Sequence, residues 1–234
     1  MDGPMCGRFV LYSLPPELQD YFDVRPITFE IPPNYNVAPT QEIPVIVRKE
    51  DGRHLEKRRW GLVPFWAKDT MIGSRMINAR IESVATKPSF KAAIRHRRCL
   101  IPADGFYEWK GKAGGKQPFF LSLPSGEPLA FAGLWEVWRD KDAASDQEPY
   151  LSCTIITTEA GKSIRDLHDR MPLILAQDAY EEWLNPENTD PAQLERLLKS
   201  RSVTELKRYP VSKLVNRVEN NSADCIKPLQ GSRD

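Results

Sequence analysis

The chain has 234 residues, of which 41% are apolar and 28% are charged, and its formal net charge is +1. This composition is ordinary for a soluble globular protein, and no apolar run approaches the roughly 20 residues that a membrane-spanning helix needs, so an integral membrane protein is not expected. A net charge near zero excludes a protein that binds nucleic acid with its whole surface, although a local basic patch can still bind phosphate.

The predicted secondary structure consists of short elements. In chain order they are a helix over Pro15–Phe22, a strand over Ile43–Val47, a helix over Ser89–Ile94, strands over Cys99–Ile101, Phe106–Trp109, Phe119–Leu123, Leu129–Trp135 and Leu151–Thr157, and helices over Asp178–Leu184 and Asp190–Lys199. Asp190 can cap the last helix, and Pro191 occupies its first position. Because these helices and strands do not alternate regularly, the sequence predicts an α+β fold with a strand-rich centre and peripheral helices.

Two polar segments interrupt this pattern. Gly111–Gln117 is typical of a hairpin tip, and Arg139–Glu148 is typical of a charged loop. Neither segment is long enough to separate two domains, so a single domain is expected. The 20 prolines, many of them beside apolar segments, favour short strands and irregular connections over long helices.

The cysteines and histidines show no metal-binding pattern. Cysteine occurs at four widely separated positions without a Cys-x-x-Cys pair, namely Cys6, Cys99, Cys153 and Cys225. Neither a zinc site nor a disulfide framework is predicted, and we expect no metal and no cofactor. The first residues also lack the basic and apolar regions of a secretory signal, which favours a cytoplasmic protein.

The first group of residues that can carry chemistry is Met5-Cys6-Gly7-Arg8-Phe9. If the mature chain began at Cys6, an α-amine would lie beside a thiol, and such a 1,2-aminothiol reacts twice with one aldehyde. The amine forms a Schiff base, and the thiolate then closes a five-membered thiazolidine ring. Both groups titrate close enough to neutral pH to react with modest help from neighbours. Alternatively, Cys6 is a small buried residue at the start of a strand.

The second group lies between Trp60 and Glu82. The Asn78 amide can orient a hydroxyl group, the Arg80 guanidinium can bind a phosphate, and the ring of Trp66 can support an unstacked base. Tryptophan is more often part of a hydrophobic core, so both interpretations of the aromatic residues stay open.

Two further motifs each contain a candidate acid–base group. In Ala103–Trp109, side-chain alternation places Glu108 on the face opposite Tyr107 and Trp109; burial in a pocket would raise its pKa and suit it to proton transfer. The alternative is a solvent-facing Glu on a half-buried strand. In Asp166–Pro172, His168 precedes an apolar run and can lie in a pocket, or it can be a structural histidine.

A basic stretch runs through Lys87–Arg98, and Arg53 and Lys57–Arg59 add to it. Basic side chains near aromatic ones can line a groove for single-stranded DNA. A solvated, charged surface explains the same pattern.

These motifs occur together in the order seen in one family. The chain resembles the SOS response-associated peptidase (SRAP) family from Met5 to about Pro228, which gives a domain over residues 5–228, an N-terminal extension over residues 1–4 and a tail over residues 229–234. The resemblance rests on Met5–Phe9, Tyr35–Pro39, Trp60–Pro64, Asn78–Arg80, Arg97–Cys99, Ala103–Trp109 and Leu167–Pro172.

The resemblance implies a single domain with a distorted, closed β-barrel-like core of short strands surrounded by helices. It also implies a monomer that binds single-stranded DNA containing abasic sites, associates with the nucleoid when bound, and protects the lesion in the DNA damage response by forming a thiazolidine with the ring-opened sugar.

The resemblance further implies roles for individual residues. Cys6 would be the nucleophile, Asn78 would orient the reacting groups, and Glu108 would transfer protons during Schiff-base formation. His168 would assist the opening of the sugar ring and the reversal of the cross-link. The DNA path would be lined by Arg8, Asn36, Pro39, Trp66, Arg80, Arg98, Thr157 and Arg170, with Arg80 and Arg170 as phosphate ligands.

The amino terminus departs from the family pattern. In the family the initiator Met directly precedes Cys and is removed, whereas four residues precede Met5 here. A retained extension would make the Cys6 nitrogen an amide, which cannot form an imine, so we expect a misassigned start or removal of these residues.

Two other activities remain open. A peptidase could use Cys6, Glu108 and His168 to cut the chain before Cys6, or to cut other proteins, and a non-catalytic module could simply shield single-stranded DNA. Schiff-base chemistry also permits weak lyase activity at abasic sites through β-elimination.

Overall fold

In the computed structural model, which describes residues 7–111, 115–141 and 147–229, five strands close into a barrel. They are β3 (Glu42–Lys49), β4 (Gly52–Trp60), β6 (Arg98–Ala103), β9 (Leu129–Trp138) and β10 (Tyr150–Glu159). Pairing runs around the ring in the order β3, β4, β10, β9, β6 and back to β3, and β4 with β10 is its one parallel pair in the described part. The closed, distorted barrel predicted from the resemblance is confirmed, as is the α+β class.

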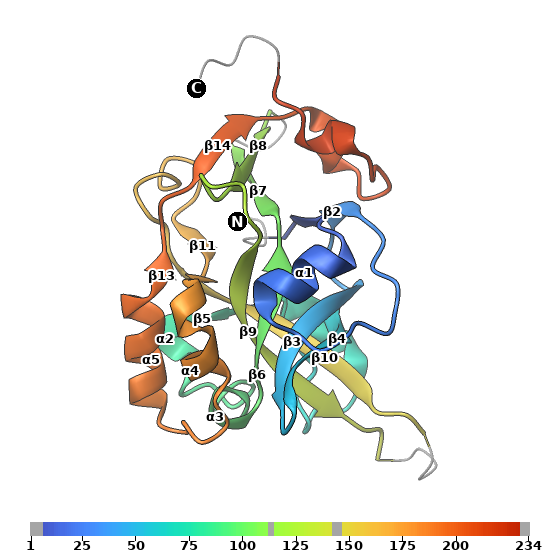
Figure 1. The fold of residues 1–234 in the computed structure, drawn as a ribbon, viewed down its shortest axis with the longest axis vertical. Coiled ribbons are helices and arrows are strands. Elements are labelled where there is room, and N and C mark those ends of the chain that lie inside the picture. Colours follow the sequence, from blue (N-terminus) through green and yellow to red (C-terminus); the bar gives the residue numbers. More distant parts are fainter. Residues whose placement is uncertain (1–6, 112–114, 142–146, 230–234) are drawn as a thin grey trace.

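A second, antiparallel sheet lies against the barrel, and Figure 1 shows its strands β7, β8 and β14 above the barrel strands. Its order is β14 (Lys207–Pro210), β8 (Gln117–Ser122), β7 (Gly105–Lys110), β1 (Phe9–Leu11) and β2 (Asn34–Val37). The Phe9 ring lies 5.3 Å from that of Trp60 and 5.8 Å from that of Phe131, measured between centroids. All three side chains are fully buried, so aromatic packing joins the two sheets.

The chain passes from the barrel to the second sheet at a buried corner between β6 and β7. Asp104 accepts hydrogen bonds from the backbone N–H groups of Tyr12 (2.5 Å) and Ser13 (2.8 Å) and from the Ser13 hydroxyl (2.5 Å). At the next position a Cβ atom would lie 2.4 Å from the Phe120 ring and 2.5 Å from the Leu121 carbonyl oxygen, so only Gly105 fits there. The Asp-Gly pair therefore fixes the angle between barrel and sheet.

The remaining strands are short and extend the edges of the barrel. They are β5 (Asn78–Arg80), β11 (Arg170–Pro172), β12 (Ile174–Leu175) and β13 (Ser202–Val203). Both β5 and β11 pair with the second half of β10.

The helices α2 to α5 gather on one side of the barrel (Figure 1). The α-helices are α1 (Pro15–Phe22), α2 (Ile81–Val84), α3 (Ala93–His96), α4 (Tyr180–Leu184) and α5 (Pro191–Ser200), and the 3₁₀ helices are η1 (Thr70–Arg75), η2 (Gln177–Ala179), η3 (Lys213–Asn216) and η4 (Ala223–Ile226). No helix in the described ranges is both long and apolar enough to cross a membrane.

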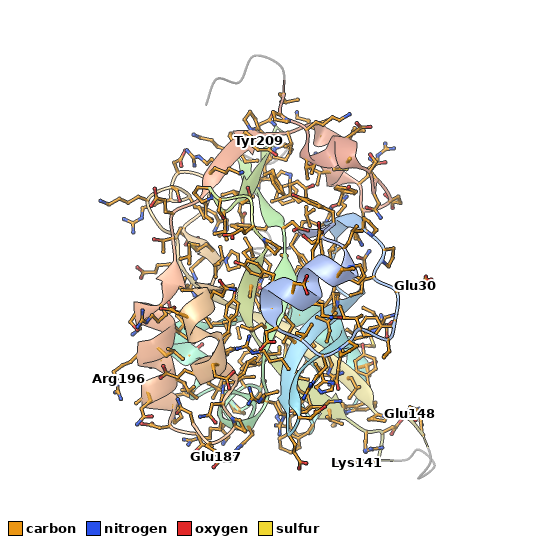
Figure 2. The ribbon with its side chains drawn as sticks, viewed as in Figure 1. Glu30, Lys141, Glu148, Glu187, Arg196 and Tyr209 are labelled. Atoms are coloured by element: carbon orange, nitrogen blue, oxygen red, sulfur yellow. The ribbon has the colours of Figure 1, made fainter. Side chains whose placement is uncertain are left out.

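Most predicted elements are confirmed, with one correction and several omissions, among them the short strands β1, β2, β5 and β11 to β14. The predicted helix over Ser89–Ile94 is wrong in its bounds, because residues 89–92 form turns and the helix is the single turn Ala93–His96. The sequence interpretation missed β4, whose charged residues hide the strand pattern. The predicted hairpin tip and charged loop lie between β7 and β8 and between β9 and β10, but residues 112–114 and 142–146 within them are outside the described residues. Figure 2 shows Lys141 and Glu148, which flank the second of these segments, at the far end of the second hairpin.

Candidate functional site

Three strands bring together four of the predicted site residues. Along β10, Ile155 lies opposite Asn78 of β5, and Thr157 lies opposite Arg80. On β11, Arg170 lies opposite Glu159 of β10. We call this edge, formed by β5, the second half of β10, and β11, the site edge. Asn78 and Arg80 on one strand therefore meet Thr157 and Arg170, which come from distant parts of the sequence.

Arg170 is held firmly within the site edge. Its guanidinium donates to both carboxylate oxygens of Glu82 (2.5 and 3.0 Å) and to the carbonyl oxygen of Thr157 (2.9 Å). Burial is the largest single influence and raises the pKa of Glu82, but the hydrogen bond from Arg170, a backbone hydrogen bond and the charges of Arg170 and Arg80 together lower it by more, so the net pKa lies below its ordinary value. Arg170 is buried and both its terminal nitrogens are hydrogen-bonded, whereas the side chain of Arg80 is exposed. Of the two predicted phosphate ligands, Arg80 is therefore the accessible one.

His168 lies just before β11, with its side chain 21% exposed. Its Nδ1 accepts a hydrogen bond from the backbone N–H of Arg170 (3.0 Å) and also lies 2.8 Å from a carboxylate oxygen of Asp169. The first contact requires an unprotonated Nδ1 and the second favours a protonated one. Both states of the ring therefore have a partner in place, as a group that gives and takes protons requires.

Glu108 is buried on β7, with only 4% of its surface exposed, so the alternative of a solvent-facing Glu is wrong. The neighbouring strand β1 pairs Phe9 with Phe106, and the N–H of Tyr107 donates to the carbonyl oxygen of Arg8 (3.1 Å). Continued for two residues, this antiparallel register aligns Gly7 with Glu108. Cys6 itself lies outside the described residues.

One ion pair links β7 to the segment that carries His168. The ammonium group of Lys110, the last residue of β7, lies 2.7 Å from a carboxylate oxygen of Asp166. The two candidate acid–base groups, Glu108 and His168, thus belong to different parts of the fold that touch each other here.

The connection from β4 to β5, which leads directly to Asn78, exposes large apolar side chains. Trp66 is 43% exposed and Trp60 is fully buried, so both interpretations of the tryptophans apply, each to a different residue. The sequence interpretation did not select Phe65 (56% exposed) or Met71 (79% exposed) as site residues. Both lie between Pro64 and Ser74, and the proline and the polar residues of that segment indicate a surface connection. Pro39 is partly exposed in the connection from β2 to β3.

Two of the predicted DNA-contacting residues bind the C-terminal segment instead. Asn36 is 1% exposed, and its amide donates to the carbonyl oxygens of Val215, Arg217 and Asn220 (3.2, 2.9 and 2.9 Å). Arg8 donates to the Asn36 side-chain oxygen and to the Val215 carbonyl oxygen, both at 2.7 Å. These bonds hold residues 215–220 beside β1 and β2.

Arg98 has a structural role that the basic stretch did not predict. The side chain is buried and donates to the carbonyl oxygens of Trp183 (2.6 Å), Ile94 (2.9 Å) and Arg95 (2.6 Å). Burial lowers the pKa of Arg98 to about 10. Arg98 therefore ties α3 to the end of α4 and presents little surface to DNA.

Two other basic residues of that interpretation, Lys57 and Arg58, line a cavity at the opposite end of the barrel. It has a volume of about 820 Å³, is called the far mouth here, and is lined by Arg25, Pro26, Thr28, Phe29, Lys49, Asp51, His54, Leu55, Glu56, Lys57, Arg58 and Leu151. Thr157 of the site edge lies six residues beyond Leu151 along β10, a distance of about 20 Å. Glu56 is paired with both Lys49 and Arg58, and Asp51 with both Arg25 and His54.

No group of three His, Cys, Asp or Glu side chains within the described ranges could hold a metal ion.

Comparisons with known proteins converge on one group. The family described as SOS response associated peptidase (SRAP) matches residues 5–218. The abasic site processing protein YoaM of Bacillus subtilis is 46% identical, over 95% of this chain and 97% of its own length. The abasic site processing protein YedK of Escherichia coli is 32% identical, over 96% of this chain and 100% of its own length. A solved structure from Bacteroides thetaiotaomicron, 24% identical, superimposes with a TM-score of 0.80 over 96% of this chain and 100% of that chain, which shows a shared fold.

Proposed function

Because the chain belongs to the SOS response associated peptidase (SRAP) family, we propose that it processes abasic sites in DNA, as the names of its relatives state for them. In this proposal the protein binds single-stranded DNA and attaches Cys6 covalently to the ring-opened sugar. The observation that carries the proposal is the buried Glu108 beside the strand that leads to Cys6, on a sheet that touches the His168 segment and, through it, the site edge.

The covalent reaction needs an α-amine and a thiol on one residue. The Cys6 amine attacks C1′ of the open-chain sugar aldehyde, and the resulting carbinolamine loses water to give a Schiff base. The Cys6 thiolate then adds to the same carbon, and the nitrogen takes up a proton. One aldehyde and one aminothiol thus become one thiazolidine and one water, without any oxidant or reductant.

Three side chains support these proton transfers. Glu108 accepts a proton from the attacking amine and donates a proton to the hydroxyl group that leaves as water, and a buried carboxyl group is suited to both transfers. His168, with a partner for either protonation state, assists the opening of the sugar ring and the reverse reaction. Asn78, on β5 at the edge of the same region, orients the sugar hydroxyl groups.

The proposed DNA path follows exposed side chains. Arg80 binds a phosphate, while Trp66 and Pro39 support bases that have lost their partners. Thr157 and Arg170 shape the path indirectly by fixing β10 and β11 around Glu82. We leave Asn36 and Arg98 out of the path and give Arg8 a positioning role, because their polar groups are engaged by the protein backbone.

The residues before Cys6 set a requirement for activity. A chain that keeps Met1–Met5 has an amide nitrogen at Cys6 and cannot form the Schiff base, so these residues have to be absent from the active protein. Removal by the chain itself, with Cys6 as nucleophile, would be compatible with the same site.

The test uses two forms of the protein, one beginning at Cys6 and one keeping Met1–Met5, with the terminus of each verified by mass spectrometry. Each form is incubated with single-stranded DNA that carries one abasic site, and the products are separated under denaturing conditions. Only the Cys6 form should give a denaturation-resistant adduct, its mass increase should equal that of the DNA minus one water, and Cys6→Ala should abolish it.

Two results would contradict the proposal. Adduct formation by a chain that keeps Met1–Met5 would exclude the amine mechanism, and a Cys6 form that binds the DNA without reacting would leave only a binding module. Cleavage of casein or of a peptide library by the Cys6 form would instead support a peptidase that acts on other proteins.

A further inference from the structure

The segment that carries His168 is a compact loop with closely spaced ends. The N–H of Ala160 donates to the carbonyl oxygen of Asp169 (2.9 Å), and within the loop the N–H groups of Ile164 and His168 donate to the carbonyl oxygens of Gly161 (3.0 Å) and Ile164 (3.1 Å). We call residues 160–169 the histidine loop. Because its internal bonds make it rigid, anything that moves one part of it moves His168.

On one side the histidine loop is anchored to the body of the protein. The side chain of Ile164 is fully buried, and the Ser163 hydroxyl donates to the carbonyl oxygen of Thr204 (2.8 Å). Gly161 lies so close to Thr204 that a Cβ atom on the glycine would be 2.8 Å from the threonine side chain. These contacts place the loop beside the barrel but leave its orientation toward the second sheet to be set elsewhere.

On the other side, one carboxylate joins the loop to the second sheet. Asp166, two residues before His168, binds Arg208 of β14 through both carboxylate oxygens (2.5 and 3.2 Å) and the Lys110 ammonium at 2.7 Å. Hydrogen bonds from Arg208 and Lys110 hold the pKa of Asp166 well below its ordinary value, so the carboxylate is charged at neutral pH.

The groups bound by Asp166 are themselves fixed relative to Glu108. Lys110 follows Glu108 by two residues on β7. The Arg208 guanidinium lies over the Phe119 ring at 5.9 Å from its centroid, and Phe119 lies directly opposite Glu108 in the pairing of β7 with β8. A single carboxylate on the histidine loop therefore contacts β7, which carries Glu108, and β14, which flanks the other side of β8.

We propose that Asp166 is a positioning residue, which holds the histidine loop against β7 and β14 and so sets the distance between His168 and Glu108. This inference rests on the proposed function, because it assigns a purpose to that distance. An exposed ion pair contributes little to stability, but a bidentate arginine pair with a second cation is the favourable case. A displacement of about 1 Å is enough to slow a reaction by about a hundredfold.

The experiment compares three variants with the protein that begins at Cys6. Asp166→Asn keeps the shape and removes the charge, and Asp166→Glu keeps the charge. Asp178→Asn is the matched control. Asp178 lies on η2, outside the site edge, and forms a similar exposed ion pair with Arg201 (2.9 Å). For each variant we would measure amide hydrogen exchange, the rate of adduct formation at saturating abasic DNA, and the Kd for DNA with a tetrahydrofuran analogue that has no aldehyde.

In Asp166→Asn, residues 160–169 should exchange faster while β6 and β9 stay unchanged. The adduct rate should fall by about ten- to a hundredfold with the Kd within about twofold of wild type. Asp166→Glu should recover most of the rate, and Asp178→Asn should behave as wild type.

Four results would overturn the inference. Unchanged exchange of the histidine loop in Asp166→Asn would mean that no clamp exists, whether or not the protein reacts with DNA. Faster exchange with an unchanged adduct rate would remove the positioning role, as would a rate loss explained by a weaker Kd. Failure of the wild-type protein to form the adduct would refute the proposed function and the purpose of the clamp, while the exchange data would still report the clamp itself.

Discussion

The site edge and the far mouth lie at opposite ends of β10, and both are rich in arginine and charged partners. At the far mouth each carboxylate has two partners, Lys49 and Arg58 for Glu56 and Arg25 and His54 for Asp51. Arg58 is buried with its guanidinium 5.1 Å from the centre of the Trp135 ring. At the site edge Arg80 is exposed, next to a connection that displays Trp66 and Phe65. Pairing and exposure, rather than the number of basic residues, therefore distinguish the end that we propose to bind DNA.

The largest effect should separate two carboxylates, Glu108 on the sheet that touches the site edge through the His168 segment and Glu56 at the far mouth. Glu108→Gln should lower the rate of adduct formation by about a hundredfold, because it removes the group proposed to transfer protons. Glu56→Gln, at the far mouth, should leave that rate within about twofold of wild type. The measurement is the single-turnover adduct rate, with thermal unfolding to verify that both variants are folded; equal rates for the two variants would remove the distinction between the regions.

The next effect concerns stability. Arg58→Met should lower the free energy of unfolding by about 2 kcal/mol, because Glu56 loses a buried partner. This loss is smaller than that expected for breaking a fully buried ion pair, because Lys49 still binds Glu56. Urea unfolding measures this change, with Lys57→Met on the exposed face of β4 as the control. A weaker affinity of folded Arg58→Met for DNA would show that the far mouth also contacts DNA.

A smaller effect should appear in the salt dependence of DNA binding. Arg80→Gln should lower the slope of log K against log salt by about one, as expected for the loss of one phosphate contact. Arg48→Gln should not change it, because Arg48 is paired with Glu181 near the far mouth (2.6 Å). Fluorescence anisotropy at several salt concentrations gives both slopes, and a change in the Arg48 variant would move the DNA path toward the far mouth.

The smallest effect should be seen in acid. Since the pKa of Asp166 is lower in the folded state, its ionised form stabilises the protein above the ordinary aspartate pKa, and this contribution is lost as the pH falls toward the folded value. The free energy of unfolding should therefore fall less in Asp166→Asn than in wild type when the pH is lowered from about 5 to about 2. The difference between the two proteins should be less than about 1 kcal/mol, because the ion pair is exposed. Thermal unfolding across this range measures it; parallel curves for the two proteins would contradict the lowered pKa.

Local signals in the sequence were sufficient for several elements. The predicted bounds of α1 match the structure because Pro15 begins it, Glu17 accepts from the Leu14 N–H (2.8 Å), and Asp23 ends it in the left-handed conformation. Likewise Asp190 accepts from the N–H of Ala192 (3.0 Å) at the start of α5. Such capping depends only on neighbours in the chain.

Other features could not be predicted, because they depend on distant parts of the chain. The inward face of β4 carries Glu56 and Arg58, which only a closed barrel with a polar mouth can accommodate, so no apolar alternation marked the strand. Arg98 and Arg80 have the same chemistry in the sequence, yet the carbonyl groups of α3 and α4 surround only Arg98. The pairing of Asp166 with β14 likewise joins residues 42 positions apart.

The Asp104 corner restricts where this protein can adapt to differently shaped ligands. All the hydrogen bonds that Asp104 receives would be broken in a buried place if β7 pivoted on β6, and Gly105 leaves no room for a larger residue to relax the turn. The position of Glu108 relative to the barrel is consequently fixed. We expect any adjustment to DNA of varying curvature to occur in the exposed connection between β4 and β5.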